Sequence, residues 1–308
     1  MSKRSTVRGR GLAVAALAAF TTTGVLVAPV SPVAAALEGD VTIASSPAKQ
    51  HVRYGSPFKL AGRVAPGQAG HTVRLEHAER GATFRPVASA RTGANGVYRF
   101  AVTARRTGSY RAVSDTGAAS APRRVTVFAA INGSSTRHVL SGRAAKVRGK
   151  LLPGAGHRAA VQVRIRKGWK TVDHARSNAR GRFSGSWKPS KPGTYRLRVR
   201  FGGDRSAGAA TSRSWRLYSY RASRASWYGP GLYGNKLGCG GRLSAGTLGV
   251  ANKHLPCGTK VKFRYHGRSV TVPVVDRGPY VGGREWDLTA ATKARLGFPS
   301  TGTVWSNK

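Results

Sequence analysis

The sequence predicts an all-β chain in which two tandem β-sandwiches precede a small closed barrel with one short helix. Its 308 residues include 40 Gly and 15 Pro but a single Met, a composition typical of turn-rich β structure. Residues 38–218 contain an internal duplication in which apolar residues alternate at period two. Residues 225–308 also alternate, and they end with one short helical stretch. Two sandwiches and a barrel account for all three observations.

Residues 1–36 have the three parts of a secretory signal peptide. A positive stretch precedes an apolar run over residues 12–20, and a small-residue cleavage site follows at residues 34–36. The positive stretch contains Lys3, Arg4, Arg8 and Arg10. An uncleaved membrane anchor is the alternative, but Thr21-Thr22-Thr23 interrupts the apolar run well short of about 20 residues. We therefore expect cleavage, export and no transmembrane segment in the mature chain.

The charge of the chain restricts its partners. There are 53 basic and 10 acidic residues, for a formal net charge of +43. Such a field attracts polyanions, namely nucleic acid, anionic lipid or acidic cell-wall polymers. Export favours the cell wall, and the absence of a recognised reader motif makes nucleic acid an unlikely partner. The chain also lacks a Gly-x-Ser-x-Gly elbow and a nucleotide-binding glycine loop.

The duplication divides the chain into domains. Gly62 and Pro66 recur as Gly149 and Pro153 at an offset of 87, and Gly96-Val97-Tyr98 recurs as Gly181-Arg182-Phe183 at an offset of 85. A unit of this size with short alternating strands fits a β-sandwich, and each unit resembles a bacterial immunoglobulin-like module. The predicted boundaries are a first sandwich at 38–128, a second at 129–218, a linker at 219–224 and the barrel at 225–308.

The two repeats read as spacer or binding modules rather than as enzymes. Their acidic residues are scattered, and only Asp115 and Asp204 occupy similar places in both units. The outward positions of the second repeat are basic, as at Arg196, Arg198 and Arg200. A solvated face and adhesion to an anionic wall polymer are both open interpretations.

The cysteines and the C-terminal elements are read from local patterns. Cys239 and Cys257 form an even pair in an exported chain without a CxxC motif, which predicts one disulfide and no metal site.

Residues 225–229 read as a strand that ends in a glycine-rich loop. Residues 259–265 and 268–276 alternate around a two-residue turn, which predicts a hairpin. Residues 289–296 predict a helix with Thr289 as its N-cap and Gly297 as its terminator.

Five motifs of the last domain have the order and spacing of the rare lipoprotein A-like double-psi β-barrel family. They are Ala225-Ser226-Trp227-Tyr228-Gly229, Leu255-Pro256-Cys257-Gly258-Thr259, Gly267-Arg268-Ser269-Val270-Thr271-Val272, Val275-Asp276-Arg277-Gly278-Pro279-Tyr280 and Trp286-Asp287-Leu288. The resemblance covers about residues 225–298 and implies a six-stranded barrel. Plant expansins and barwin share this barrel, and the family includes lytic transglycosylases of peptidoglycan. By resemblance, the paired acids are Asp276 and Asp287.

Carboxylates are scarce in this domain, which narrows the chemistry. Beyond residue 224 the acids are Asp276, Glu285 and Asp287. Cleavage of a glycosidic bond requires an acid that protonates the leaving oxygen, and Asp276 is the candidate general acid and base, with Asp287 in support. Each also has a structural alternative, because Asp276 is placed to cap the Gly278-Pro279 turn and Asp287 to cap the helix near Thr289.

Substrate contacts are expected from aromatic and basic side chains. The candidate sugar platforms are Tyr228, Tyr233, Tyr280 and Trp286, with Trp227 expected in the core, and Arg277 is expected to pair with a carboxylate or a wall peptide. Two positions depart from the family pattern, since Gly241 stands where relatives carry Glu and Asn252 where a His is common. Peptidoglycan cleavage and non-catalytic, expansin-like wall binding both remain as hypotheses, for a monomer without a cofactor.

Overall fold

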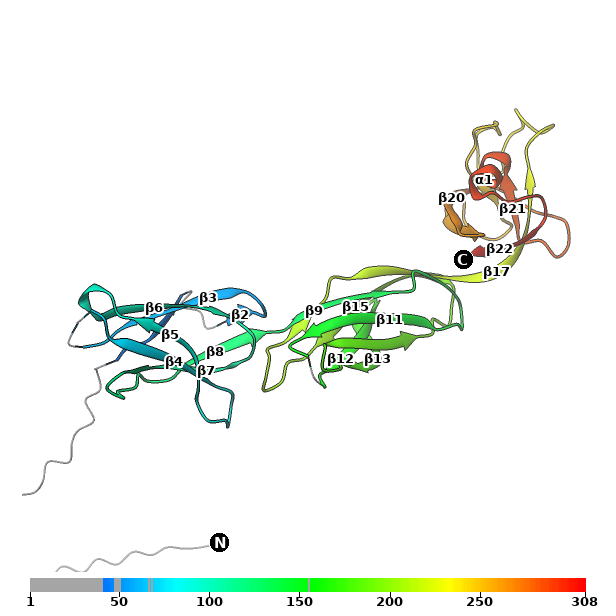
Figure 1. The fold of residues 1–308 in the computed structure, drawn as a ribbon. Helices are drawn as coiled ribbons and strands as arrows, with labels where there is room; N and C mark the ends of the chain where they lie inside the picture. The colour runs from blue at the N-terminus through cyan, green and yellow to red at the C-terminus, as the bar shows by residue number, and fades with distance from the viewer. Residues whose placement is uncertain (1–40, 47–50, 66, 68, 155) are drawn as a thin grey trace, which may run out of the picture. The chain divides into compact units, whose positions relative to one another are not determined.

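A computed structural model of the chain describes residues 41–46, 51–65, 67, 69–154 and 156–308. The predicted signal peptide at residues 1–36 lies outside the described residues, so export stays a prediction. The described part is built from strands and one short α-helix (Figure 1). No helix within it is long and apolar enough to cross a membrane.

The first sandwich packs a three-stranded sheet of order β1-β3-β6 against a five-stranded sheet of order β2-β8-β7-β4-β5. Phe58 and Leu60 of the small sheet and Val73 and Leu75 of the large sheet are buried in one core, as their alternation predicts. The elements are β1 (Ala44–Ser46), β2 (His51–Arg53), β3 (Pro57–Arg63), β4 (Thr72–Ala78), β5 (Arg85–Arg91), the 3-10 turn η1 (Ala94–Gly96), β6 (Val97–Thr103), β7 (Gly108–Ser114) and β8 (Arg123–Phe128).

The second sandwich repeats this arrangement. Its small sheet has the order β14-β11-β9, and its large sheet contains β13-β12-β15-β17 with the short strands β10 and β16 at its side. In both copies a short early strand pairs in parallel with the last long strand, β2 with β8 and β10 with β17. The bounds are β9 (Ala130–Ser135), β10 (His138–Leu140), β11 (Ala145–Leu152), β12 (Arg158–Ile165), β13 (Gly168–Arg176), β14 (Arg182–Trp187), β15 (Gly193–Phe201), β16 (Ala210–Thr211) and β17 (Trp215–Tyr228).

The glycines that the duplication aligns have the same role in both copies. A Cβ atom on Gly62 would lie 2.4 Å from Tyr98 Oη, and one on Gly149 would lie 2.4 Å from Phe183 Cζ. Tyr98 and Phe183 are themselves aligned by the duplication. Because an aromatic ring covers the backbone at this point, only a residue without a side chain fits.

The two aligned acids are also used alike. Asp115 Oδ2 lies 3.1 Å from His71 Nδ1, and Asp204 Oδ2 lies 2.6 Å from His157 Nδ1. The hydrogen bond with His71 lowers the pKa of Asp115. Since the same pair fastens equivalent loops in both sandwiches, these acids serve the fold.

The C-terminal domain is a closed ring of six strands, as predicted. The ring runs β17-β21-β18-β20-β19-β22 and closes where β22 pairs with β17. Residues 219–224, which we expected to be a linker, instead lie inside β17, which therefore serves both the second sandwich and the barrel. The other elements are β18 (Val250–Ala251), β19 (Lys260–Tyr265), β20 (Arg268–Asp276), β21 (Trp286–Thr289), α1 (Ala290–Leu296) and β22 (Gly302–Ser306).

The local signals of the barrel are confirmed. His266 and Gly267 both have positive φ, 39° and 85°, which is the two-residue turn that joins antiparallel strands. The Thr289 side chain accepts the first helical N–H bond, and Gly297 ends α1 in the left-handed conformation at φ 65°. The expectation that Asp287 caps the helix is wrong, because Thr289 fills that position.

One pH effect on stability follows from His138. Its ring stacks against Tyr218 and Tyr220, and burial, followed by nearby cations, lowers the pKa of His138 to about 4. The cations are Arg264, Lys262 and Arg137. Between pH 6.5 and 4 the unfolded chain binds a proton here that the folded chain excludes, so the free energy of unfolding falls as the pH falls through this range. Urea unfolding at pH 7, 6, 5 and 4 measures it.

The control for this effect is His138→Phe, which keeps a ring between the tyrosines but cannot titrate. The loss of stability between pH 7 and 4 is expected to be smaller in this variant than in the wild type. Equal losses in the two proteins would contradict the assignment.

Candidate functional site

The two predicted acids lie in one row across four strands of the barrel. Ser226 of β17 is registered with Asp287 of β21, and Asp287 with Ala251 of β18. Ala251 is paired with Asp276 of β20 through a register shift between Val250 and Ala251. Registered residues on neighbouring strands point to the same face of a sheet. The two carboxylates therefore share one face, with their backbones two strands, or about 10 Å, apart and the small side chain of Ala251 between them.

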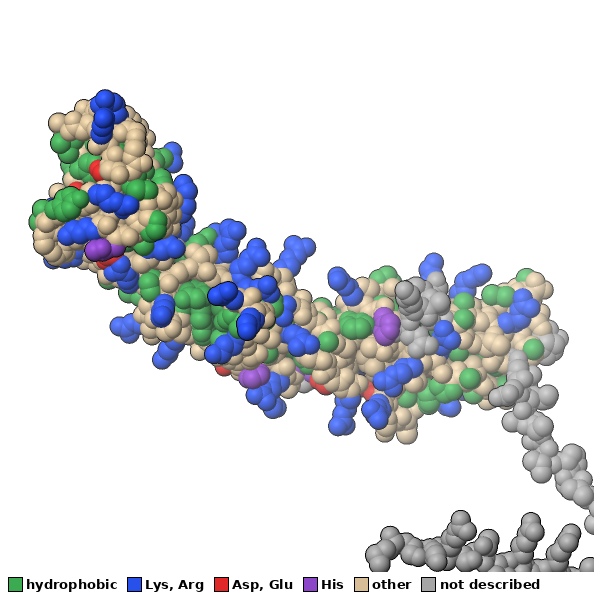
Figure 2. Space-filling view, turned by 180° about the vertical axis from the view of Figure 1, so that it is seen from behind, with side chains coloured by type: hydrophobic (Ala, Val, Ile, Leu, Met, Phe, Trp, Pro, Cys, Tyr) green, Lys and Arg blue, Asp and Glu red, His purple; other side chains and the backbone are tan. Residues whose placement is uncertain are grey.

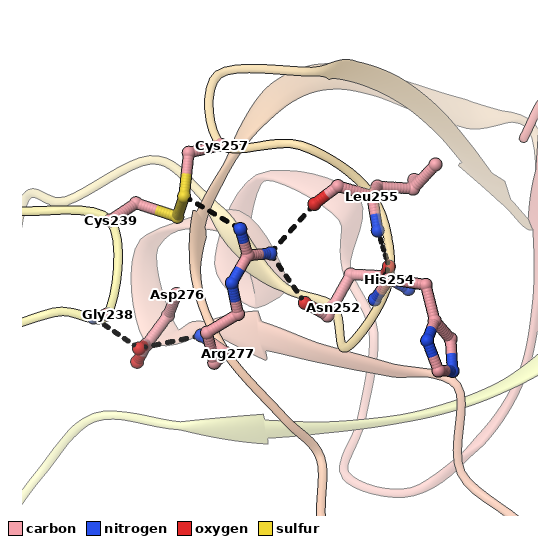
Figure 3. The surroundings of a disulfide bond; sticks show 8 residues. All are labelled: Gly238, Cys239, Asn252, His254, Leu255, Cys257, Asp276 and Arg277. Atoms are coloured by element: carbon pink, nitrogen blue, oxygen red, sulfur yellow. Dashed lines mark hydrogen bonds between the residues drawn. A yellow bond between two sulfur atoms is a disulfide. The ribbon is translucent and has the colours of Figure 1, made fainter.

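Asp276 is held by backbone N–H groups. Its Oδ1 accepts hydrogen bonds from Gly238 N at 2.7 Å and from Arg277 N at 2.8 Å (Figure 3). Its carbonyl oxygen accepts from Asn252 N at 3.1 Å. None of these bonds involves Gly278 or Pro279, so the prediction that the Asp276 side chain caps this turn is wrong. The bonds fix the carboxylate beside the loop that precedes Cys239.

Asp287 is the more enclosed of the two acids. The half-buried carboxylate accepts a hydrogen bond from Ser226 Oγ at 2.8 Å. Burial raises the pKa of Asp287 above the ordinary carboxyl value, and the charge of Asp276 adds to the rise. The Ser226 hydrogen bond and the charge of Arg284 act in the opposite direction. This carboxyl group therefore retains its proton to a higher pH than a free aspartate does.

Tyr228 belongs to the same cluster, through its hydroxyl rather than through its ring. The hydroxyl is buried and lies beside the Asp276 carboxylate. Burial, followed by the charges of Asp276 and Asp287, raises the pKa of Tyr228. The hydroxyl is thus a neutral donor beside two carboxylates, a role different from the predicted sugar platform.

Arg277 is used inside the protein. Its guanidinium donates to the carbonyl oxygens of Asn252 at 3.1 Å and Leu255 at 2.7 Å, and to Cys257 Sγ at 3.0 Å (Figure 3). The Asn252 side chain in turn accepts from two backbone N–H groups of the same loop, those of His254 and Leu255. The expectation that Arg277 reaches substrate is therefore replaced by a structural role in shaping this loop.

The disulfide between Cys239 and Cys257 is confirmed, with a Cα–Cα distance of 5.5 Å. Cys239 follows Gly238, whose N–H binds Asp276, and Cys257 contacts Arg277, which follows Asp276. The disulfide therefore ties together the two loops that hold the Asp276 carboxylate (Figure 3).

The aromatic candidates separate by exposure. Tyr280 is 80% exposed and Tyr233 is 42% exposed, so both have faces open to a ligand. Trp286 is 0% exposed and packs edge-on against Phe263 in the barrel core, so its predicted contact with sugar is wrong. Trp227 is packed partly buried against the core, as expected, with Lys293 Nζ 3.9 Å from its ring centroid.

Gly241, which we expected to replace a Glu of the family pattern, lies in a turn that depends on glycine. Its φ is 79°, its carbonyl accepts from Leu237 N at 3.0 Å, and no heavy atom lies within 4 Å of where a Cβ would be. The left-handed conformation disfavours Glu whatever the space. Gly241 therefore sets the local shape of this loop.

Three residues of the site were missed in the sequence. Ser226 is two positions before Tyr228 on a strand, which places both on one face, so it was accessible to prediction. Arg284 has no local signal, and Gly238 reaches Asp276 from 38 positions away. Within the described residues, no three His, Cys, Asp or Glu side chains come together as a metal site.

Gly238→Ala is expected to displace Asp276. The added Cβ would lie 3.0 Å from Asp276 Oδ1 and 2.9 Å from Arg277 Cγ, so the N–H bond to the carboxylate must lengthen. Overpacking of this kind costs about 1–3 kcal/mol. Urea unfolding measures the loss. Gly246→Ala is the matched control, because nothing lies within 4 Å of its Cβ position, and a loss of equal size there would contradict the expectation.

Residues 220–305 match the lytic transglycolase family. A Synechocystis protein named "Probable endolytic peptidoglycan transglycosylase RlpA" is 44% identical over 80 residues, which are 25% of this chain and 25% of that protein. A protein of the same name from Aquifex aeolicus is 42% identical over 87 residues, 28% of this chain and 38% of that protein. The match thus spans well under half of either relative and lies in the barrel.

Among solved structures, invasin, titled a bacterial integrin-binding protein, aligns with 77% of this chain and 55% of its own. The sequence identity is 15% and the TM-score is 0.34.

Proposed function

With residues 220–305 forming a barrel of the lytic transglycolase family, we propose that this chain is an exported wall protein that binds and cleaves peptidoglycan glycan strands. The observation that carries the proposal is the row across the barrel, where two carboxylates face one side and Asp287 has a raised pKa. Paired carboxyl groups with different environments are the usual means of moving a proton to and from a glycosidic oxygen.

Asp276 is the proposed proton-transfer group. In a lytic transglycosylase the hydroxyl group of the muramyl sugar attacks its own anomeric carbon, so no water is activated. One carboxyl group protonates the leaving oxygen and takes the proton from the attacking hydroxyl. Asp276 suits this role because its position is fixed by Gly238 N and Arg277 N, which both bind Oδ1, and because it lies beside the neutral Tyr228 hydroxyl. A fixed carboxylate loses little entropy when the sugar binds.

Asp287 and Tyr228 set the charge around Asp276. A protonated Asp287 removes one of two neighbouring negative charges, and the Tyr228 hydroxyl is a neutral donor toward the carboxylates. The exposed rings of Tyr233 and Tyr280 are the proposed platforms for the glycan, because aromatic faces bind the apolar faces of sugar rings.

The second candidate is a wall-binding or wall-loosening module without catalysis, like the expansins. Two observations favour it, since Asn252 stands where a His is common and Gly241 where relatives carry Glu. Asn252 is 5% exposed, its side-chain oxygen accepts from backbone N–H groups and its amide nitrogen donates to the Glu285 carbonyl oxygen, and an amide cannot transfer a proton as an imidazole can.

Digestion of purified peptidoglycan sacculi separates these candidates. The mature chain is expected to release soluble fragments that end in 1,6-anhydromuramyl residues, which mass spectrometry identifies. Fragments with reducing ends instead would mean hydrolysis with an activated water. If the chain pellets with sacculi but releases no fragments, the enzyme hypothesis is excluded and the non-catalytic binding hypothesis is favoured.

A further inference from the structure

The second sandwich has a groove of about 450 Å³ that the proposed reaction does not use. Three arginines, three serines and one tryptophan line it, and we call it the arginine groove: Arg137, Arg196, Arg216, Ser134, Ser135, Ser214 and Trp215. Its volume is in the range of pockets that bind small ligands. No acidic residue lines it.

Two of the arginines oppose each other directly. Arg196 of β15 and Arg216 of β17 are register partners in an antiparallel pair, and both are exposed. Cβ atoms of such partners are about 5 Å apart, and like charges at this distance destabilise a sheet. Neither arginine, nor Arg137, forms a salt bridge with an acid among the residues described. An anion between them would remove this repulsion.

The positive charge continues beyond the groove along β15. Arg198 donates to Gln162 Oε1 at 2.9 Å and lies 4.2 Å above the Trp169 ring, so its side chain is held in place. Arg200 is exposed two residues further on. Alternate strand residues are about 7 Å apart, so Arg196, Arg198 and Arg200 form a ladder of positive charge that leaves the groove in one direction. A chain of repeated anionic units fits such a ladder better than an isolated anion does.

The wall of the groove points to a sugar. Trp215 Nε1 donates to Ser135 Oγ at 2.7 Å, which fixes the indole ring. The ring packs against the sandwich core on the face of β17 opposite to Arg216, and its partly exposed edge lines the groove. A fixed aromatic edge beside hydroxyl and guanidinium groups suits a saccharide that carries an anionic group. One aromatic ring provides a single stacking platform, whereas single-stranded nucleic acid requires successive ones.

We infer that the arginine groove binds one unit of an anionic glycopolymer, with the anionic group between Arg196 and Arg216 and the sugar beside the exposed edge of Trp215. The ladder along β15 holds the following units. Guanidinium groups bind phosphate and carboxylate alike, so the shared chemistry is an acidic saccharide repeat. This second site does not depend on the barrel or on the proposed cleavage.

The test measures the affinity of the mature chain for defined polymers by isothermal titration calorimetry at 0.15 M salt. The polymers are a sugar-phosphate polymer, polygalacturonate, inorganic polyphosphate and single-stranded DNA. Arg196→Gln/Arg216→Gln is expected to weaken binding of the sugar-phosphate polymer or of polygalacturonate at least tenfold, and the stronger of the two identifies the anion. The matched control is Arg148→Gln/Arg182→Gln, which removes the same charge from exposed positions on the small sheet and is expected to weaken binding less than twofold.

Two further measurements keep the inference falsifiable. Removal of the opposed charges is expected to leave the melting temperature unchanged or higher, so weaker binding would not reflect unfolding. Trp215→Phe is expected to weaken binding of the saccharide polymers but not of polyphosphate, which has no sugar. Equal losses in the groove and control variants would show that only the overall charge binds, and DNA binding that depends most on the groove would assign it to nucleic acid. Either result overturns the inference.

Discussion

Asp276→Asn is expected to slow the release of anhydro-muropeptides about 100- to 10,000-fold while binding to sacculi is retained. In the wild type, Asp276 Oδ1 accepts from Gly238 N at 2.7 Å and from Arg277 N at 2.8 Å. The amide oxygen of the variant can accept the same two bonds, so the loop geometry is expected to be retained. It cannot transfer a proton to the glycosidic oxygen. Mass spectrometry of the fragments gives the rate, and a pelleting assay gives the binding.

Asp173→Asn is the matched control for this substitution. Asp173 also accepts N–H bonds from two residues, from His174 at 2.7 Å and from Ser186 at 2.6 Å, but it belongs to the second sandwich. Its replacement is expected to leave the rate unchanged. A rate retained in Asp276→Asn, or lost equally in both variants, would remove Asp276 from the reaction.

Asp287→Asn separates the roles of the two acids. The amide resembles the neutral form of Asp287 and keeps an acceptor for Ser226 Oγ, so partial activity is expected. Because the pKa of Asp287 is raised, its titration changes the activity at a pH above the ordinary carboxyl range. This change of activity with pH is expected to be absent in the Asn variant. Complete loss at every pH would instead assign the proton transfer to Asp287.

Removal of the disulfide has the largest expected effect on stability. Cys239→Ser/Cys257→Ser opens a loop that spans a sequence separation of 18, which costs about 3 kcal/mol on the chain-entropy estimate. Gly238 then loses its fixed position beside Asp276, and Arg277 loses its contact with Cys257 Sγ. We expect amides of β19 and β20 to exchange about 100-fold faster with deuterium, and sacculus cleavage to fall with them.

The internal control for this variant is the first sandwich. Amides of β4 and β7 lie in a separate core and are expected to keep their exchange rates. Acceleration there as well would mean that the double variant unfolds the chain as a whole. Unchanged exchange in the barrel together with full cleavage would show that the disulfide is dispensable for the site.

Local patterns in the sequence were sufficient for the elements of the fold. Period-two alternation located the strands, the offset of 85–87 located the duplication, and Thr289 and Gly297 marked the ends of the helix correctly. These signals succeed because turns, caps and alternation depend on neighbouring residues. The prediction of a linker at 219–224 was wrong because it too relied on local sequence. These residues instead continue β17 from the second sandwich into the barrel.

Aromatic and basic side chains of the site could not be assigned in this way. Trp286 and Tyr280 lie six positions apart in similar surroundings, yet one is buried in the barrel and the other is 80% exposed. Arg277 follows the candidate acid Asp276, but its guanidinium is occupied by carbonyl groups 22 and 25 positions earlier. Burial and partner choice are set by packing between strands, which local sequence does not contain.

The sequence by itself therefore determined the all-β class, the two sandwiches and barrel and the disulfide, and it singled out the two candidate acids, because each leaves a pattern of residue type and spacing. Only the tertiary structure decided which groups meet. Ring closure and strand register bring Ser226, Asp287, Ala251 and Asp276 into one row, and a glycine 38 positions away binds the carboxylate of Asp276. Register follows from how the whole ring closes, so no stretch of sequence contains it.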